Sequence, residues 1–321
     1  MKKHCFIPVI TIMFVVLFSA ALIAGPSEAK YPEKGLTLIV VYGTGGGTDV
    51  TARLLASHME KVIGRPVTVK NVTGGGGWVG WSTLAHAKPD GYTIGYLNIP
   101  NIYAGYLDPK MKRPESLESF TPIMNHVTDP CIWAVKADSK FKSLKELVDY
   151  AKANPKQKSI TAHGYGNDDH LAILWMESLT GAKFNVIHNK STAISKSQLL
   201  GGHVDALGAN VSEIFQMAKK GEIRVLGVMG EKRSPFLPDV PTFKEQGYEI
   251  VNSVSRGIAG PAGLPDDIAA AIADALEKTV QMKAHQEKAT QLGLALDVMK
   301  GATYKTFLKD TEQRIKKLMG W

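Results

Sequence analysis

The sequence predicts an α/β protein whose two α/β domains lie side by side. Three observations lead to this fold class. With 321 residues, 44% of them apolar and 21% charged, the chain is long enough for two ordinary globular cores. Strand-like and helix-like segments alternate along it. The succession of strand, glycine-bearing loop and helix occurs in both halves.

The first 29 residues have the pattern of a secretory signal peptide. Two lysines precede an apolar stretch over residues 6–23, and small residues follow it up to Ala29. We expect export with cleavage near Ala29, and an N-terminal membrane anchor is the alternative. Cys131 would be the one cysteine of the exported chain, so no intramolecular disulfide is expected.

The first half of the exported chain begins with a strand over residues 36–41. Its apolar residues do not alternate with polar ones, as expected for a strand covered on both faces. Gly47 or Thr48 can cap the helix that follows, and Gly64 is expected to end it. The remaining elements expected in this half are a strand over residues 66–72, a short helix to about residue 87 and a strand over residues 92–97.

In the second half, the capping box of Ser143 and Glu146 starts a helix that runs to about residue 153. Two segments, residues 128–139 and 249–263, can link the domains, so the last stretch is expected to fold back onto the first domain. Further strands are expected at residues 159–162, 184–187, 204–207 and 223–229, and helices at 171–179, 266–283 and 304–318. Domain 1 would comprise residues 30–130 and 255–321, and domain 2 residues 131–254.

Glycines follow the first strand, in the stretch "YGTGGGTDV" from Tyr42 to Val50. Glycine lets backbone N–H groups approach a ligand closely, and the next helix aims its unpaired N–H groups at the same point, which makes an anion site. Thr48 can add a hydroxyl donor, and Asp49 can cap the helix or accept a bond from the ligand. The dinucleotide pattern G-x-G-x-x-G fails because Thr48 holds its last position. A purely structural turn remains the alternative.

A second glycine loop, "TGGGGWVG" from Thr73 to Gly80, also lies between a strand and a helix. Adjacent parallel strands would bring both loops to the same carboxyl edge of the sheet, where α/β proteins bind ligands. Trp78 and Trp81 can stack on an aromatic or apolar part of a ligand, or pack in the core.

Several longer stretches resemble the substrate-binding components of tripartite tricarboxylate transporters, the Bug or TctC-like family. The opening "YPEKGLTLIVVYGTGGGTDVTARLLA", the strand "PDGYT" and the stretches "GYGNDDHL", "LLGGHVDAL" and "KRSPFLPDVPTFKEQG" fall in the family's order and spacing. The run "LPDVPTFKEQG" is specific, whereas glycine loops alone would not be. The resemblance covers essentially all of the exported chain. It implies a bilobal periplasmic binding protein of the type II class, with two α/β domains joined by two crossover strands.

The resemblance also implies where a ligand lies. In the family, two loops of the first domain clasp a carboxylate through backbone N–H groups and ordered water, and the second domain supplies the opposing wall. Carried over to this chain, the first-domain residues are Gly46, Gly47, Thr48, Asp49, Gly75, Gly76 and Gly77, and the opposing residues are Gly166, Asn167 and Asn210.

The chain departs from the family pattern at some of these places. Gly43-Thr44 stands where the family commonly has Ala-Pro, Trp78 replaces a small or polar residue, and Asn167 stands where serine is frequent. Arg256 occupies a position that is often aromatic. It can bind a second carboxylate of the ligand or form a surface or interdomain salt bridge.

Other chemistry finds little support. The stretch "HGYGNDDH" at residues 163–170 offers metal-ligand side chains without the spacing of a known zinc site, so neither a metal nor a cofactor is expected. No G-x-S-x-G or H-E-x-x-H motif occurs, and Cys131 lies in a strand-like run as a small buried residue. The net charge is +8, but the basic residues are scattered along the chain and form no basic stripe, which argues against nucleic acid as a partner.

We therefore expect a periplasmic receptor, and not an enzyme, that captures a small organic anion with a carboxylate and delivers it to a membrane permease. We expect a monomer that contacts the permease transiently. A secreted enzyme acting on a carboxylate and a sensory co-receptor that uses the same site are the alternatives. Di- and tricarboxylates, amino acids and aromatic acids all fit as ligands.

Overall fold

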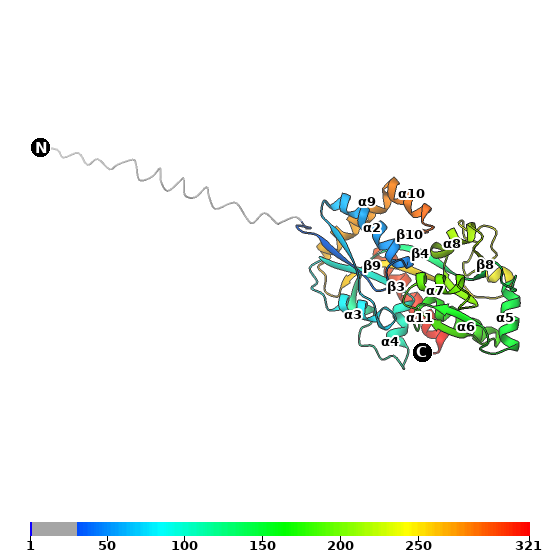
Figure 1. The fold of residues 1–321 in the computed structure, drawn as a ribbon. Coiled ribbons are helices and arrows are strands. Elements are labelled where there is room, and N and C mark those ends of the chain that lie inside the picture. The colour runs from blue at the N-terminus through cyan, green and yellow to red at the C-terminus, as the bar shows by residue number, and fades with distance from the viewer. Residues whose placement is uncertain (2–30) are drawn as a thin grey trace. The chain divides into compact units, whose positions relative to one another are not determined.

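The computed structural model of the protein describes Met1 and residues 31–321 (Figure 1). The predicted signal peptide, residues 1–29, therefore lies, apart from Met1, outside the described residues. All the elements named below belong to one unit, residues 34–321. Within this unit no helix is long and apolar enough to cross a membrane.

One curled mixed sheet runs through this unit, and the long strand β4 (Phe120–Lys136) belongs to both of its halves. In the first half, β1 (Leu36–Val40) lies between β2 (Val67–Asn71) and β3 (Thr93–Ile99), and all three are parallel. The expected covering of β1 on both faces is confirmed, since four of its five residues are buried. The parallel pairing brings the loops after β1 and β2 to the same edge of the sheet, as predicted.

Next to β3, the strand β9 (Ser253–Pro261) pairs antiparallel with both β3 and the first part of β4, and β10 (Leu296–Lys300) adds to β4. From Cys131 onward β4 changes partners and pairs with β7 (Ala206–Asn210) and β8 (Ile223–Val228). The strands β5 (Ser159–Ala162) and β6 (Asn185–His188) follow β7, both in parallel.

The chain crosses between the halves twice at neighbouring places. One crossing is β4 itself, and the other is the segment just before β9, where the Asn252 carbonyl accepts a hydrogen bond from the Cys131 N–H at 3.0 Å. The predicted α/β class, with two halves joined by two crossover strands, is confirmed. The domain boundaries at residues 130 and 255 stay a prediction.

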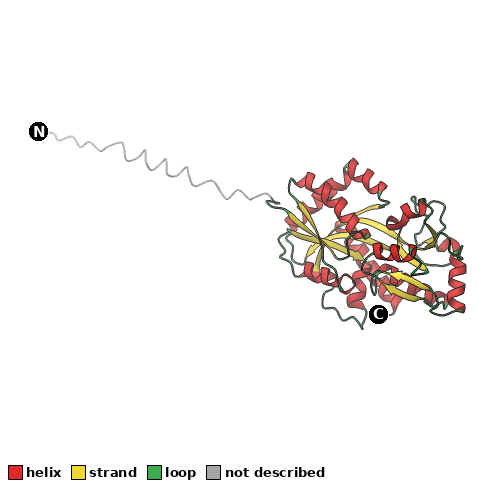
Figure 2. Cartoon of the chain, in the orientation of Figure 1, coloured by secondary structure: helices red, strands yellow, loops and turns green. Residues whose placement is uncertain are grey.

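Helices cover both faces of each half, as Figures 1 and 2 show. On the first half, α2, α9 and α10 pack on one face and α3, α4 and α11 on the other; on the second half, α5 and α6 pack opposite α7 and α8. The bounds are α2 (Gly47–Ile63), α3 (Trp78–Ala85), α4 (Asn101–Leu107), α5 (Leu144–Ala153), α6 (Asp168–Thr180), α7 (Thr192–Leu200), α8 (Val211–Lys219), α9 (Asp266–Gln281), α10 (Lys283–Gln291) and α11 (Gly301–Met319).

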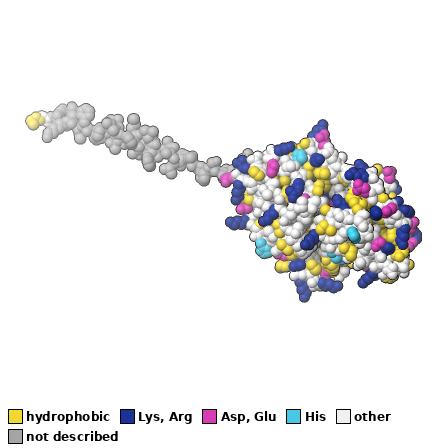
Figure 3. Space-filling model, in the orientation of Figure 1, with side chains coloured by type: hydrophobic (Ala, Val, Ile, Leu, Met, Phe, Trp, Pro, Cys, Tyr) yellow, Lys and Arg dark blue, Asp and Glu magenta, His cyan; other side chains and the backbone are white. Residues whose placement is uncertain are grey.

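The second part of β4 separates two hydrophobic cores. Because successive side chains of a strand point to opposite faces, Cys131 and Trp133 pack with α5 and α6, while Ile132 and Ala134 pack with α7 and α8. The C-terminal helix α11 packs on the first half, as predicted, with Tyr304 completely buried. Basic side chains are scattered over the face of the molecule seen in Figure 3.

The sequence missed some elements. The helix expected over residues 266–283 ends at Gln281, because Met282 has an extended backbone with ψ 125°, and α10 begins directly after it. The helix α4 and the strand β10 were not expected either. With seven residues, α4 is too short for a clear helical period.

Candidate functional site

The first glycine loop leads from β1 into α2 and leaves the start of this helix without a side-chain cap. The N-cap is Gly46, and not Gly47 or Thr48 as the sequence suggested. The N–H groups of Thr48 and Asp49, which belong to the first helical turn, make no hydrogen bond to another residue between 31 and 321. Both N–H groups, and the positive end of the helix dipole, are therefore free to bind a polar group.

Asp49 does not present its carboxylate to the site. The side chain is 2% exposed and accepts hydrogen bonds from the Gly45 N–H, Arg53 and Asn71, each at 2.9 Å. Burial opposes its ionisation, but these donors lower the pKa of the carboxyl below its usual value. The sequence left Asp49 either as a cap of the helix turn or as an acceptor for the ligand. The geometry favours a local structural role, because the carboxylate bonds to the loop before α2 and to neighbouring side chains.

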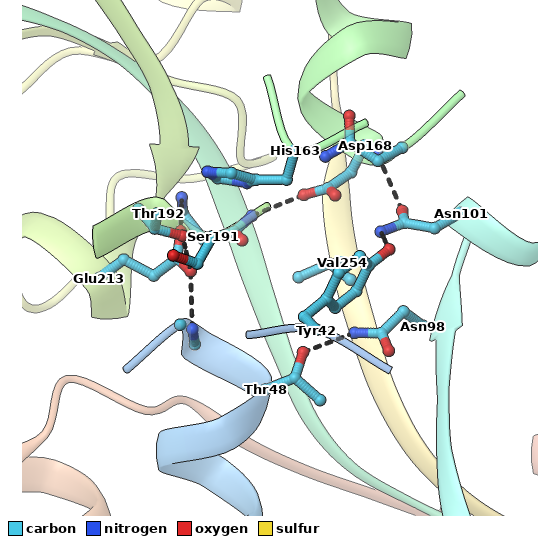
Figure 4. A pocket seen from close by; sticks show the side chains of 14 residues that line it. Tyr42, Thr48, Asn98, Asn101, His163, Asp168, Ser191, Thr192, Glu213 and Val254 are labelled. Carbon is cyan, nitrogen blue, oxygen red and sulfur yellow. Dashed lines mark hydrogen bonds between the residues drawn. The ribbon is translucent and has the colours of Figure 1, made fainter. Parts of the chain in front are cut away.

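A small inner cavity of about 30 Å³ lies in front of α2, between the two halves of the sheet (Figure 4). It has room for one or two water-sized groups. Its polar side chains come from the first loop, from β3, from the loop after β5, from the end of β7 and from the starts of α4, α6, α7 and α8. The lining residues are Tyr42, Gly46, Gly47, Thr48, Asn98, Asn101, His163, Asn167, Asp168, Ser191, Thr192, Asn210, Glu213 and Val254.

Glu213, in the first turn of α8, reaches across this cavity to α2. Its Oε1 accepts a hydrogen bond from the Gly47 N–H at 2.8 Å and another from the Thr192 hydroxyl, and its Oε2 accepts from the Asn210 N–H at 3.0 Å. Burial opposes its charge, but His163, Arg256 and these donors lower the pKa of the Glu213 carboxyl. An ionised side chain of the second half thus accepts a hydrogen bond from the Gly47 N–H, one of the donors at the start of α2.

Arg256 lies in β9 as part of a buried ion pair. Its Nη1 is 2.8 Å from the Asp129 carboxylate, and both side chains are 1% exposed. Its Nη2 donates to Asn210 at 3.3 Å and would lie 2.4 Å from a Cβ at Gly47. The structure therefore places Arg256 in a salt bridge, but the pair is buried between β4 and β9 and is neither on the surface nor between the predicted domains. The position of Nη2 also explains why residue 47 has no side chain.

Next to the inner cavity, His163 forms an ion pair with Asp169, with 2.6 Å between Nδ1 and Oδ2. Burial opposes the charge of the imidazole, but the Asp169 carboxylate raises the pKa of His163 to about 9. The Nε2 of His163 is buried and has no hydrogen-bond partner in the described part of the chain. The Nε2–H of the protonated ring can therefore donate a hydrogen bond to a ligand in the cavity.

Asp168 lines the inner cavity at the start of α6. Its Oδ2 accepts from the Asn210 Nδ2 at 2.8 Å and from the Cys131 thiol at 3.3 Å. Ligand atoms of Cys131, Asp168 and Asp169 lie within 4.8 Å of one another. Burial and these carboxylates raise the pKa of the Cys131 thiol, so a metal-binding thiolate is disfavoured there.

The second glycine loop borders a larger outer cavity of about 320 Å³. Gly75 and Gly76 have positive φ angles of 55° and 70°, which a residue with a side chain rarely adopts. Their N–H groups have no hydrogen-bond partner among the residues described. The lining residues are Val41, Tyr42, Thr73, Gly74, Gly75, Gly76, Gly77, His163, Gly164, His188, Asn189 and Lys190. Because the two cavities share Tyr42 and His163, they adjoin.

The structure brings together most of the predicted site residues of the two loops and the second half. Asn167 lines the inner cavity and caps α6 by accepting from the His170 N–H at 2.9 Å. Gly166 is not in either lining; its N–H donates to the His170 ring at 3.0 Å. Asn210 lines the inner cavity and binds Asp168.

The tryptophans lie elsewhere. Trp78 is 5% exposed and donates to Glu115 at 2.7 Å, and Trp81 is 1% exposed and donates to the Tyr96 carbonyl at 3.1 Å. Their rings pack edge to face, with centroids 5.8 Å apart, in the hydrophobic core of the first half. The geometry favours packing over ligand stacking for both.

Several residues of the inner cavity were not predicted from the sequence. Asn98 and Asn101 follow or end β3, the third parallel strand at this edge, and the rule that placed the two loops there could have found them. Thr192 and Glu213 gave no such signal, because helix starts rich in polar residues are common on any surface.

Comparisons with known proteins agree with this geometry. Residues 51–320 match the tripartite tricarboxylate transporter family receptor. A UPF0065 protein in the gbd 5′ region of Cupriavidus necator is 30% identical over 300 residues, which cover 94% of this chain and 91% of that protein.

Two solved structures share the fold. The periplasmic binding protein BugD is 29% identical, with a TM-score of 0.79 over 90% of this chain and 96% of its own. MatC from Rhodopseudomonas palustris, solved with bound malate, has a TM-score of 0.83 at 23% identity, over 90% of this chain and 99% of its own. With its α/β halves, its two crossings and a cleft between them, the chain belongs to the receptor family of the tripartite tricarboxylate transporters.

Proposed function

We propose that the protein is a periplasmic solute receptor that captures a small organic anion through a carboxylate and delivers it to a tripartite tricarboxylate-type permease. The observation that carries this proposal is a set of backbone N–H groups at one edge of the sheet that have no partner among residues 31–321. They belong to Thr48 and Asp49 in the first loop and to Gly75 and Gly76 in the second. N–H groups of this kind bind carboxylate oxygens through charge-assisted hydrogen bonds.

Capture combines these donors with closure of the cleft. A ligand that bonds to both halves stabilises the closed form over the open one, and water excluded from the closed site strengthens each polar contact. The family match and the malate bound to MatC, a protein of the same fold, support a carboxylate as the ligand. The fold and the family are those of substrate-binding proteins, which supports binding without turnover.

A thermal-shift screen of the purified, processed protein against small carboxylates tests the proposal. A ligand at 100 times its Kd stabilises the folded protein by about 2.7 kcal/mol, which raises the Tm by several degrees. Calorimetry should then give one bound ligand per chain. If no carboxylate raises the Tm while an uncharged solute does, the proposal is wrong.

The site can be checked on the same ligand. Replacing Gly76, where φ is 70°, by valine should distort the second loop and weaken binding by at least ten-fold. Gly181 has a similar φ of 76° but ends α6 away from both cavities, so Gly181→Val is the matched control for backbone strain. Equal affinities of the two variants would remove the second loop from the site.

Two other roles use the same cleft. A secreted enzyme would consume the bound carboxylate, so product formation during incubation would favour it. A sensory co-receptor would report to a signalling protein, and deletion of its gene would abolish induction while uptake through other carriers continued.

A further inference from the structure

Direct hydrogen bonds between groups of the protein itself join the two halves across the cleft (Figure 4). At the start of α2, the Gly47 N–H of the first half donates to Glu213 of the second half at 2.8 Å. At the start of α4, the Asn101 side chain accepts from the Asp168 N–H of the second half at 2.9 Å. Both N–H groups belong to the first turn of a helix, which supplies no acceptor for them. Their acceptors lie in the opposite half, so both bonds break when the halves separate.

A third bond lies at the rim of the cleft. Tyr165, in the loop before α6, is 42% exposed, and its hydroxyl donates to the Asp108 carboxylate just after α4 at 2.8 Å. Burial and the hydrogen bond to Asp108 raise the pKa of Tyr165 to about 12, so the phenol keeps the proton that it donates. A hydrogen bond to a carboxylate is of the stronger, charge-assisted kind.

The acceptors of the two inner bonds are held in place by their own halves. The Asn101 amide donates to the Tyr42 hydroxyl at 2.8 Å within the first half. In the second half, Glu213 accepts from the Asn210 N–H at 3.0 Å and from the Thr192 hydroxyl. Because these contacts already fix both side chains, closure orders them little further and costs little side-chain entropy.

The halves also touch where the loop before α6 meets α4 and the second glycine loop. A Cβ at Gly166 would lie 2.2 Å from the Ala104 Cβ, and a Cβ at Gly164 would lie 3.0 Å from the Gly76 Cα. The φ angles of Gly164 and Gly166 are 105° and 74°. Residues without side chains therefore permit a direct contact between the halves at this place.

We propose that these contacts form a latch that closes the cleft before a ligand binds. The latch comprises the pairs Gly47–Glu213, Asn101–Asp168, Tyr165–Asp108 and Gly166–Ala104. Closed molecules are then the majority of the free receptor, and a ligand enters through the open minority. The association rate is reduced by the open fraction, while the ligand need not supply the free energy of closure. This control of ligand entry rests on the proposed function, whereas the latch itself is a property of the free protein.

Hydrogen exchange of the processed protein tests the latch without any ligand. The protein is unfolded and dialysed in urea to remove co-purified solutes, then refolded, and amide exchange is followed by NMR. The Gly47 and Asp168 amides should exchange at least ten-fold more slowly than unprotected amides, because their bonds break only when the halves open. Unprotected exchange at both amides would overturn the inference, whether or not the protein binds a carboxylate.

A substitution at Gly166 tests the contact of its loop with α4. In Gly166→Ala, the new Cβ would meet Ala104 and keep the halves apart, so the Gly47 amide should exchange at least ten-fold faster than in the wild type. Gly47 lies in the other half, so local distortion around residue 166 does not reach it. Gly202→Ala is the matched control, because Gly202 has a similar φ of 73° and no atom within 4 Å of its added Cβ.

A second variant guards against a folding defect in the first. Tyr165→Phe removes the bond at the rim and adds neither atoms nor backbone strain, so exchange at Gly47 should accelerate about five-fold. Small-angle X-ray scattering should also give a larger radius of gyration for Gly166→Ala than for the wild type and Gly202→Ala. Wild-type exchange at Gly47 in both variants, with unaltered circular dichroism, would overturn the inference.

Discussion

Replacing Arg256 by methionine removes the cation of a buried ion pair and keeps much of the side-chain volume. The guanidinium and the Asp129 carboxylate are both 1% exposed and lie 2.8 Å apart, in β9 and β4 at the place where the chain crosses between the halves. After the replacement, the hydroxyl and the N–H of Ser212 remain as donors to Asp129.

Removal of one partner from a buried ion pair costs about 3–5 kcal/mol, because the other charge stays buried without compensation. The two donors from Ser212 favour the lower end of this range, about 3 kcal/mol. For a chain of this size, where each kcal/mol changes the Tm by about 2 °C, the variant should melt about 6 °C lower. Burial already raises the pKa of Asp129, and without Arg256 it rises further, so the deficit should shrink as the pH falls and the carboxyl takes up a proton.

Urea denaturation at pH 7.5 and pH 5 measures this loss. The double variant Asp129→Asn with Arg256→Met removes both charges and should recover part of the free energy of unfolding. A single variant within 1 kcal/mol of the wild type at pH 7.5, or a double variant no more stable than the single one, would refute the view that the pair is a buried, mutually compensating unit.

Three further predictions concern the site, the pH response and the core. Gly47→Val should weaken ligand binding at least ten-fold by calorimetry, since its Cβ would lie 2.4 Å from Arg256, and wild-type affinity would show that the start of α2 does not bind the ligand. Burial lowers the pKa of His126 to about 3 and of His285 to about 4, so both are neutral in the folded protein. Unfolding lets them take up protons below their ordinary pKa of about 6.5, and stability should fall by up to about 1.4 kcal/mol per pH unit for each histidine between pH 6 and pH 4; urea midpoints that stay level there would argue otherwise. Trp78→Phe should lose a buried hydrogen bond and about 1–3 kcal/mol of unfolding free energy in urea, with ligand affinity unchanged, and a weakened affinity would return this residue to the site.

The sequence predicted the fold well where patterns are local. The strand over residues 159–162 and the helix from Asp266 were placed correctly, because alternation, glycines and acidic first turns mark such elements directly. The pairing of β4 with partners in both halves is a property of distant segments, and no window of sequence contains it.

The site was predictable only in part, because some of its residues meet through contacts between distant segments. The glycine loops follow strands, so their place at the sheet edge follows from topology. The position of Glu213 above the start of α2 depends instead on how the two halves pack, and so does the pairing of Arg256 with Asp129. From the sequence, Trp78 could stack on a ligand or pack in the core, and only the residues that surround it in the structure distinguish the two roles.

The strand β4 has a consequence for how the protein comes apart. Its residues before Pro130 are bonded to β9 and those after it to β7 and β8, so a single stretch of backbone supplies an inner edge to both half-sheets. In addition, Arg256 and Asp129 of the first half are hydrogen-bonded to Asn210 and Ser212 of the second, so melting of one half would break bonds that hold the shared strand in the other. Scanning calorimetry should therefore record one heat-absorption peak for the whole chain, whose van't Hoff and calorimetric enthalpies coincide.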